Sequence, residues 1–305
     1  MFSTLFQLMG MMFLLISFGA ILRKRGIVTD SGKKCITDLI LYAVLPGNII
    51  KAFSTDLGEN FLSKFLIVLI VAVLIQVLCL IISYTCYRKM QRNETPIFQY
   101  ATVCSNSGFI GNPLAEGVFG SVGLIYASVF LIPQRIVMWT AGVSFFDTES
   151  DRKSAYKKIM THPCMVATYI GLIIMCFHIT LPTVLMKTVT SLSNCCTALT
   201  MLYMGFILAD VSVKDMVDLK SLSFCLIRLV VIPLIVYGAC RFFSIDPLIT
   251  GVCALLSGMP AGSTTALLAS KYEADEKCAT KCVVLSTLLS LGSIPIWSAF
   301  LLSGI

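Results

Sequence analysis

Long apolar runs, separated by short polar connections, follow one another along the whole chain. A membrane-spanning helix needs about 20 apolar residues, at roughly 1.5 Å each across a hydrocarbon core of about 30 Å. Ten segments meet this length: residues 2–22, 33–53, 61–87, 96–119, 122–146, 162–179, 183–209, 221–243, 247–270 and 278–303. The pattern therefore predicts an all-α membrane protein with ten transmembrane helices.

Two of the predicted spans contain residues that interrupt a helix. The fourth holds Gly111-Asn112-Pro113 and the ninth holds Gly258-Met259-Pro260, each well inside its span. In the fourth, we expect Gly108 and Gly111 to end a first half-helix in a left-handed turn. Asn112 should then cap a second half-helix, with Pro113 at its first position. The alternative is that these prolines only kink two packed helices.

The interruptions also indicate a repeat. The longest polar connection, residues 147–160, separates five spans in residues 1–146 from five in residues 161–305. An odd number of spans means that the two halves enter the membrane from opposite sides, and both interruptions fall in the fourth span of a half. Interrupted helices at matching positions of two inverted repeats indicate the binding site of a transporter.

The distribution of charge orients the chain. Only 13% of its residues are charged, about half the share in soluble domains. Of the 23 Lys and Arg residues, 17 lie in one set of loops and four on the opposite side. The positive-inside rule places the first set, with the linker 147–160, in the cytoplasm and both termini outside the cell membrane. The net charge of +7 thus fits a protein in a lipid bilayer, and we expect no nucleic-acid partner.

Other chemistry is not indicated. The 13 cysteines are mostly scattered singly in apolar runs, which favours helix packing over disulfides or a metal site. No nucleotide-binding loop and no nucleophile–base pair is recognisable. The sequence therefore predicts no enzyme activity, no cofactor and no metal.

Charged and polar residues within the spans are the candidate site. A charge at the bilayer centre costs at least ~2.5–3.5 kcal/mol, so such a residue almost always faces protein or water. We expect Arg135 and Gln134 to bind the carboxylate of an anionic substrate, because arginine offers a two-pronged donor. The alternative is an ion pair between Arg135 and Glu116, and Glu116 could also couple transport. Arg228 should extend to the cytoplasmic face.

Further candidates surround the interruptions. A polar cavity there would be lined by Asn48, Asn106, Ser107, Asn112, Pro113, Met259, Pro260, Ser263 and Thr264. Asp38 could carry a coupling proton if it is buried. A capping or packing role at the cytoplasmic end of its span is the simpler interpretation.

Four stretches carry a wider resemblance: LYAVLPGNIIKAF at 41–53, SNSGFIGNPL at 105–114, SGMPAGSTTALLAS at 257–270 and VVLSTLLSLGSIPIW at 283–297. Together they resemble the auxin efflux carrier family, including its bacterial permeases. The resemblance implies two inverted five-helix repeats, with helices 4 and 9 broken and crossing near the midplane, beside a site for organic anions. Members often carry a proline in the seventh span, where this chain has Ala198, so we assign no substrate contact to that span.

These observations predict a secondary transporter that moves a small organic anion by alternating access. Two alternatives stay open. One is a sodium-coupled symporter of the bile-acid type, with Asn106, Ser107 and Thr264 among the sodium ligands. The other is a membrane receptor that binds a ligand without moving it. A homodimer is also open.

Overall fold

A computed structural model describes residues 2–303, except residues 55–60, 89, 143, 147–160, 162, 178, 210–216 and 263. The predicted linker 147–160 and Ser263 therefore lie outside the described residues. The first half contains α1 (Phe2–Lys24), α2 (Asp30–Leu39), η1 (Ile40–Val44), α3 (Leu45–Phe53), α4 (Phe61–Cys86), α5 (Thr95–Val103), η2 (Ser107–Gly111), α6 (Asn112–Val137) and η3 (Met138–Gly142), where η marks a π-helical turn. The second half contains α8 (Pro163–Cys176), α9 (Thr183–Asn194), α10 (Cys196–Ala209), α11 (Leu219–Leu226), η5 (Ile227–Val231), α12 (Ile232–Phe242), α13 (Pro247–Ser257), α14 (Thr264–Lys271) and α15 (Glu276–Ser303).

The described residues thus confirm the all-helical prediction, but they do not establish ten spans. Six helical stretches are long and apolar enough to cross a membrane: Asp30–Phe53, Ser63–Cys86, Ser107–Val137, Thr183–Ala209, Leu219–Phe242 and Glu276–Ser303. One reason for the smaller number is that Ser107–Val137 joins parts of two predicted spans. A left-handed Gly120 (φ 71°) divides α6 between them, a conformation that glycine adopts without strain. Pro247–Ser257 is short because the ninth predicted span is interrupted after it.

The outer surface of the helices is apolar. On α4, Leu66, Ile70 and Leu74 are exposed, as are Leu14 and Phe18 on α1. Water would penalise such a surface, whereas lipid accepts it. Together with the buried polar residues described below, this inverted distribution identifies a multi-pass membrane protein.

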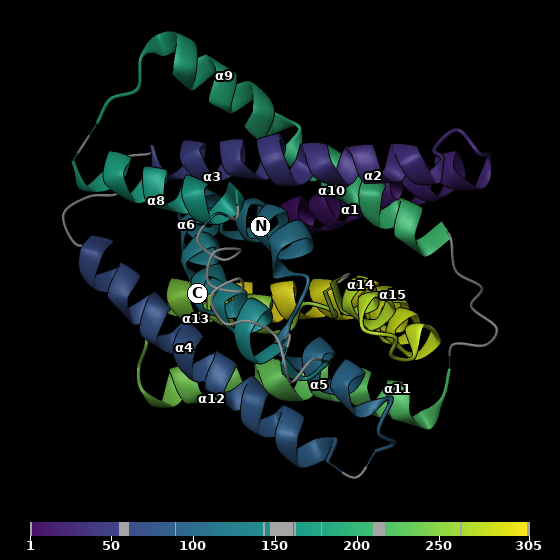
Figure 1. Ribbon diagram of the computed structural model, residues 1–305. Coiled ribbons are helices and arrows are strands. Elements are labelled where there is room, and N and C mark those ends of the chain that lie inside the picture. The colour runs from purple at the N-terminus through teal and green to yellow at the C-terminus, as the bar shows by residue number, and fades with distance from the viewer. Residues whose placement is uncertain are drawn as a thin grey trace.

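The helices form two groups (Figure 1). In the first group, α1 packs against α10, and α3 packs against α8 and α9. At the contact of α1 with α10, a Cβ atom on Gly205 would lie 2.1 Å from the Ile16 carbonyl oxygen, so only glycine fits. The second group contains the interrupted helices: α4 packs against α5 and α6, α12 against α13, and α11 against α15. Contacts of α3 with α6 and of α1 with α15 join the two groups.

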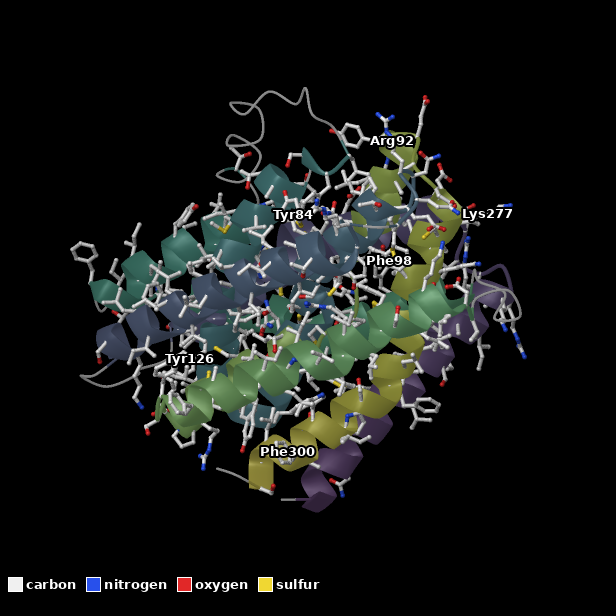
Figure 2. The ribbon with its side chains drawn as sticks, turned by 90° about the horizontal axis from the view of Figure 1, so that it is seen from below. Tyr84, Arg92, Phe98, Tyr126, Lys277 and Phe300 are labelled. Carbon is white, nitrogen blue, oxygen red and sulfur yellow. The ribbon has the colours of Figure 1, made fainter. Side chains whose placement is uncertain are left out.

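Ion pairs tie predicted cytoplasmic loops to one another. Lys220 Nζ lies 2.6 Å from Glu94 Oε2, and Lys281 Nζ lies 3.6 Å from Asp218 Oδ2. Burial raises the pKa of Asp218, but hydrogen bonds from Ser221 and the Lys281 charge bring it below its usual value. Figure 2 places Arg92 and Lys277 at this same end, away from Tyr126 and Phe300. Among the described residues, the basic segments around Arg92, Lys220 and Lys277 therefore share one end of the molecule; which side of the membrane this end faces stays a prediction.

Candidate functional site

The two interrupted segments meet directly. After α5 ends, Ser105 forms an isolated antiparallel bridge with Ala261, which follows α13. The Asn106 amide donates to the Pro260 carbonyl oxygen (2.8 Å), and the Gly262 amide donates to the Cys104 carbonyl oxygen (2.8 Å). Each interruption thereby satisfies backbone groups of the other, which is what broken backbone at membrane depth requires.

The details of the first interruption differ from the sequence prediction. The backbone leaves the helix at Cys104 (φ −108°, ψ 97°), earlier than expected. From Ser107 the π-helical turn η2 runs directly into α6, with right-handed helical angles at both Gly111 and Asn112. The predicted left-handed turn at Gly108 and Gly111 is therefore wrong, and so is the predicted capping role of Asn112.

Gly111 has a different role, namely a close approach between the interrupted segments. A Cβ atom there would lie 2.5 Å from Leu256 Cδ2, near the end of α13. Asn112 and Pro113 are buried in the first turn of α6. The Asn112 side-chain oxygen has no hydrogen-bond partner among the described residues.

A compact polar network surrounds the bridge on the side of α6. The Ser105 and Ser107 hydroxyl oxygens lie 2.6 Å apart, and Ser107 also donates to the Leu256 carbonyl oxygen at 3.0 Å. Gln134 Oε1 accepts from the Ser105 hydroxyl (3.0 Å), and Gln134 Nε2 donates to the Ser105 carbonyl oxygen (2.8 Å). Asn106 Nδ2 lies 3.5 Å from Met204 Sδ, a weak acceptor. Of the predicted site residues, Asn106, Ser107 and Gln134 thus gather at the interruption.

The second interruption is buried as well. Met259 and Pro260 have almost no exposed surface, and the Ala261 amide donates to the Ser286 hydroxyl at 3.1 Å. Thr264, at the start of α14, accepts a hydrogen bond from the Tyr100 hydroxyl (3.1 Å). The next residue, Thr265, is fully buried, and its hydroxyl has no partner among the described residues.

Arg135 is buried. Its guanidinium lies within electrostatic range of Cys164 and Tyr169 on α8. Its Nη1 atom has no hydrogen-bond partner among the described residues, and it makes no ion pair with Glu116. The alternative of a structural Arg135–Glu116 pair is therefore wrong in this conformation. Among the described residues, no hydrogen bond or ion pair joins Arg135 to the interruptions.

Glu116 contacts Asn48 instead. Asn48 Nδ2 donates to Glu116 Oε2 at 3.3 Å, and Asn48 Oδ1 accepts from the Ser193 hydroxyl at 2.6 Å. Asn48 is fully buried, so this chain of three residues joins α3, α6 and α9 inside the protein. Ser193 belongs to the seventh predicted span, to which no contact was assigned. Its position next to the turn at Cys195, where α9 gives way to α10, is the signal that could have indicated it. Asp38 is exposed on α2 and does not join the site.

Arg228 does not extend to the cytoplasmic face as predicted. Only 2% of its surface is exposed, and it lies between the two interruptions. Nε donates to the Met259 carbonyl oxygen and Nη1 to the Thr102 carbonyl oxygen, both at 2.9 Å. Sequence reasoning missed this position because the acceptors are backbone atoms of remote segments, which carry no signature in residue type.

A cavity of about 440 Å³ adjoins the first interruption. It is lined mainly by apolar side chains of α1, α10 and α15, with the hydroxyls of Thr287 and Ser290. None of the predicted site residues lines the cavity. Two of its lining residues, Ile110 and Leu114, lie on the first interrupted segment, and a third, Met204, contacts Asn106. This volume is in the usual range for a small-molecule site. The cavity lies between the two helix groups.

Comparison with known proteins supplies a family. The model of a family described as membrane transport protein matches residues 4–156 and 148–298. An uncharacterized transporter from Methanothermobacter thermautotrophicus is 25% identical over 292 residues, which cover 94% of this chain and 95% of that protein. An uncharacterized transporter from Methanocaldococcus jannaschii is 24% identical over 291 residues, which cover 91% of this chain and 92% of that protein.

Proposed function

Since the chain belongs to the membrane transport protein family, the auxin efflux carrier-like family that its motifs indicate, we propose that it is a secondary transporter of a small organic anion. The substrate binds beside the contact of the two interrupted helices and crosses the membrane by alternating access. It leaves unchanged, so the protein is a carrier and not an enzyme.

The observation that carries this proposal is the bridge between Ser105 and Ala261. Maintaining two broken helices inside a membrane protein is costly, because every freed amide and carbonyl group needs a partner. Transporters of several folds use such broken helices to bind substrate near the midplane. The buried Asn106, Ser107 and Gln134 supply polar side chains at the same place.

Unsatisfied polar groups support a polar substrate, and one of them, on Arg135, supports an anionic one. Arg135 Nη1, Asn112 Oδ1 and Thr265 Oγ1 are all buried without a partner among the described residues. Buried polar groups in folded proteins are nearly always hydrogen-bonded, so exceptions indicate a missing ligand or water. Arg135 is a fully charged donor, which a carboxylate suits best. Because Arg135 faces α8 here, it reaches the substrate only when the two helix groups move relative to one another.

The contacts between helices support two inverted repeats. In the proposed ten-span arrangement, α1 and α8 are the first spans of the two halves, and α3 and α10 belong to the second spans. The first span of each half then packs against the second span of the other, as α1 does with α10 and α8 with α3. Such an exchange of partners is what an inverted repeat requires, and it provides two related groupings for an alternating-access motion.

A thermal-shift comparison tests the substrate class. We expect a carboxylate that binds to raise the melting temperature of the purified protein by about 5 °C at roughly a hundredfold excess over Kd. Indole-3-acetate and succinate should each be compared with the corresponding amide. The amide has nearly the same shape but no negative charge, so the comparison separates the effect of the charge on binding from that of the shape. If the amides stabilise the protein as well as the acids do, the anion assignment is wrong.

A further inference from the structure

Arg228 holds the two interruptions together. It lies in the π-helical turn η5, which connects α11 to α12, and its guanidinium reaches the Thr102 carbonyl on one side and the Met259 carbonyl on the other. A π-helical turn changes the direction in which side chains point, and such turns are frequent at functional sites. The position is fully internal, with Cys79 Sγ of α4 at 3.8 Å from Nη1.

Both carbonyl groups belong to the broken backbone. Thr102 lies in the last turn of α5, where an uninterrupted helix would direct the Asn106 amide to its carbonyl; that amide binds the Pro260 carbonyl instead. Met259 lies beyond the end of α13. The two acceptors are thus carbonyls that the interruptions set free. In transporters with broken helices, such carbonyls at half-helix C-termini coordinate the coupling cation.

In the part of the chain that the structure describes, dipoles balance the charge of Arg228. Among the residues that the structure describes, no carboxylate forms an ion pair with it. Its other neighbours within electrostatic range are the thiols of Cys79 and Cys104 and the phenol of Tyr87. A cation surrounded by carbonyl oxygens and neutral groups is the arrangement of an ion site, with a side chain in place of the ion.

We propose that Arg228 is a built-in cation that takes the place of a bound sodium or potassium ion at the contact of the interrupted helices. As far as this concerns coupling, it rests on the proposed transport function. The positive charge stays in place throughout the cycle, so the transporter does not couple to a sodium or potassium gradient through this position. Of the alternatives that the sequence left open, this disfavours the sodium-coupled symporter.

Melting experiments test the cation site without any substrate. The wild-type protein should melt at the same temperature in NaCl, KCl and choline chloride of equal ionic strength. Arg228→Gly should lower the melting temperature by roughly 5 °C or more, because two buried carbonyl groups lose their donor. Low concentrations of guanidinium chloride should restore part of this loss in Arg228→Gly but not raise the melting temperature of the wild type.

Several results would overturn the proposal. One is a saturable stabilisation of the wild type by sodium or potassium over choline. Another is an Arg228→Met variant that melts like the wild type and shows no response to guanidinium. If Arg228→Gly does not fold, the melting temperatures of the wild type in the three salts and of Arg228→Met still test the proposal.

Uptake experiments separate this inference from the transport function. Reconstituted wild-type protein should take up labelled indole-3-acetate or succinate equally well with sodium, potassium or choline as the outside cation. Uptake that requires sodium or potassium would contradict the proposed role of Arg228 but not the proposed transport function. Absence of uptake under all conditions would contradict the proposed transport of these acids, while the melting experiments would still test the role of Arg228.

Discussion

Arg135→Met is expected to lower the uptake of a carboxylate substrate by about 10- to 100-fold, the effect of losing one charge-assisted hydrogen bond in a buried site. The folded protein should not lose stability, and its melting temperature should stay equal or rise. The reason is that Arg135 is buried, while among the described residues its Nη1 has no hydrogen-bond partner and it forms no ion pair with Glu116, so its charge costs folding energy in the absence of substrate. Uptake by proteoliposomes and thermal melting measure the two effects separately.

Opposite changes in activity and stability distinguish a binding residue from a structural one. A structural arginine would lower both together when it is replaced. Arg135→Lys keeps the charge without the two-pronged geometry and should retain part of the uptake. Arg241→Met is a matched control, because Arg241 is exposed at the end of α12 and should be replaceable without effect. An Arg135→Met variant with unchanged substrate affinity would remove Arg135 from the site.

Gly262→Pro should reduce uptake to the background of empty liposomes. The substitution removes the amide that donates to the Cys104 carbonyl oxygen, one of the two hydrogen bonds of the bridge. It also places ring atoms where even a Cβ atom would lie 3.1 Å from that oxygen. The two interruptions should therefore separate, and their polar side chains should lose their common arrangement.

Gly262→Ala is the matched variant for this test. It keeps the amide and adds only the Cβ atom, so we expect it to retain a substantial part of the uptake. Size-exclusion chromatography and melting show whether Gly262→Pro is folded. If the folded Gly262→Pro variant transports like the wild type, the bridge between Ser105 and Ala261 is not needed for function.

The sequence was a good guide to where the helices are interrupted. Glycine and proline have strong local effects, and their recurrence in two spans pointed to both interruptions, which the structure brings into contact. The local geometry was a poorer prediction. Asn112 and Pro113 have the residue types of a helix start, and α6 does begin at Asn112, but the helical backbone runs into it from the π-helical turn η2 without the predicted left-handed turn.

Partners of the charged residues could not be predicted in the same way. Glu116 lies 19 residues before Arg135 in the sequence, yet it binds Asn48 on another helix. Arg228 binds two carbonyl groups that any residue type could supply, so only the fold identifies them. The sequence places each of these charges within a predicted span, but the group that balances it depends on contacts between remote segments.

The most direct test of the central claim is uptake of labelled organic acids by proteoliposomes that contain the purified protein. A secondary carrier should give saturable uptake of a carboxylate, competition by the unlabelled acid but not by its amide, and exchange of the accumulated label when unlabelled acid is added outside. Binding of the acid without any movement of label into the liposomes would contradict a carrier, and it would favour a membrane receptor instead.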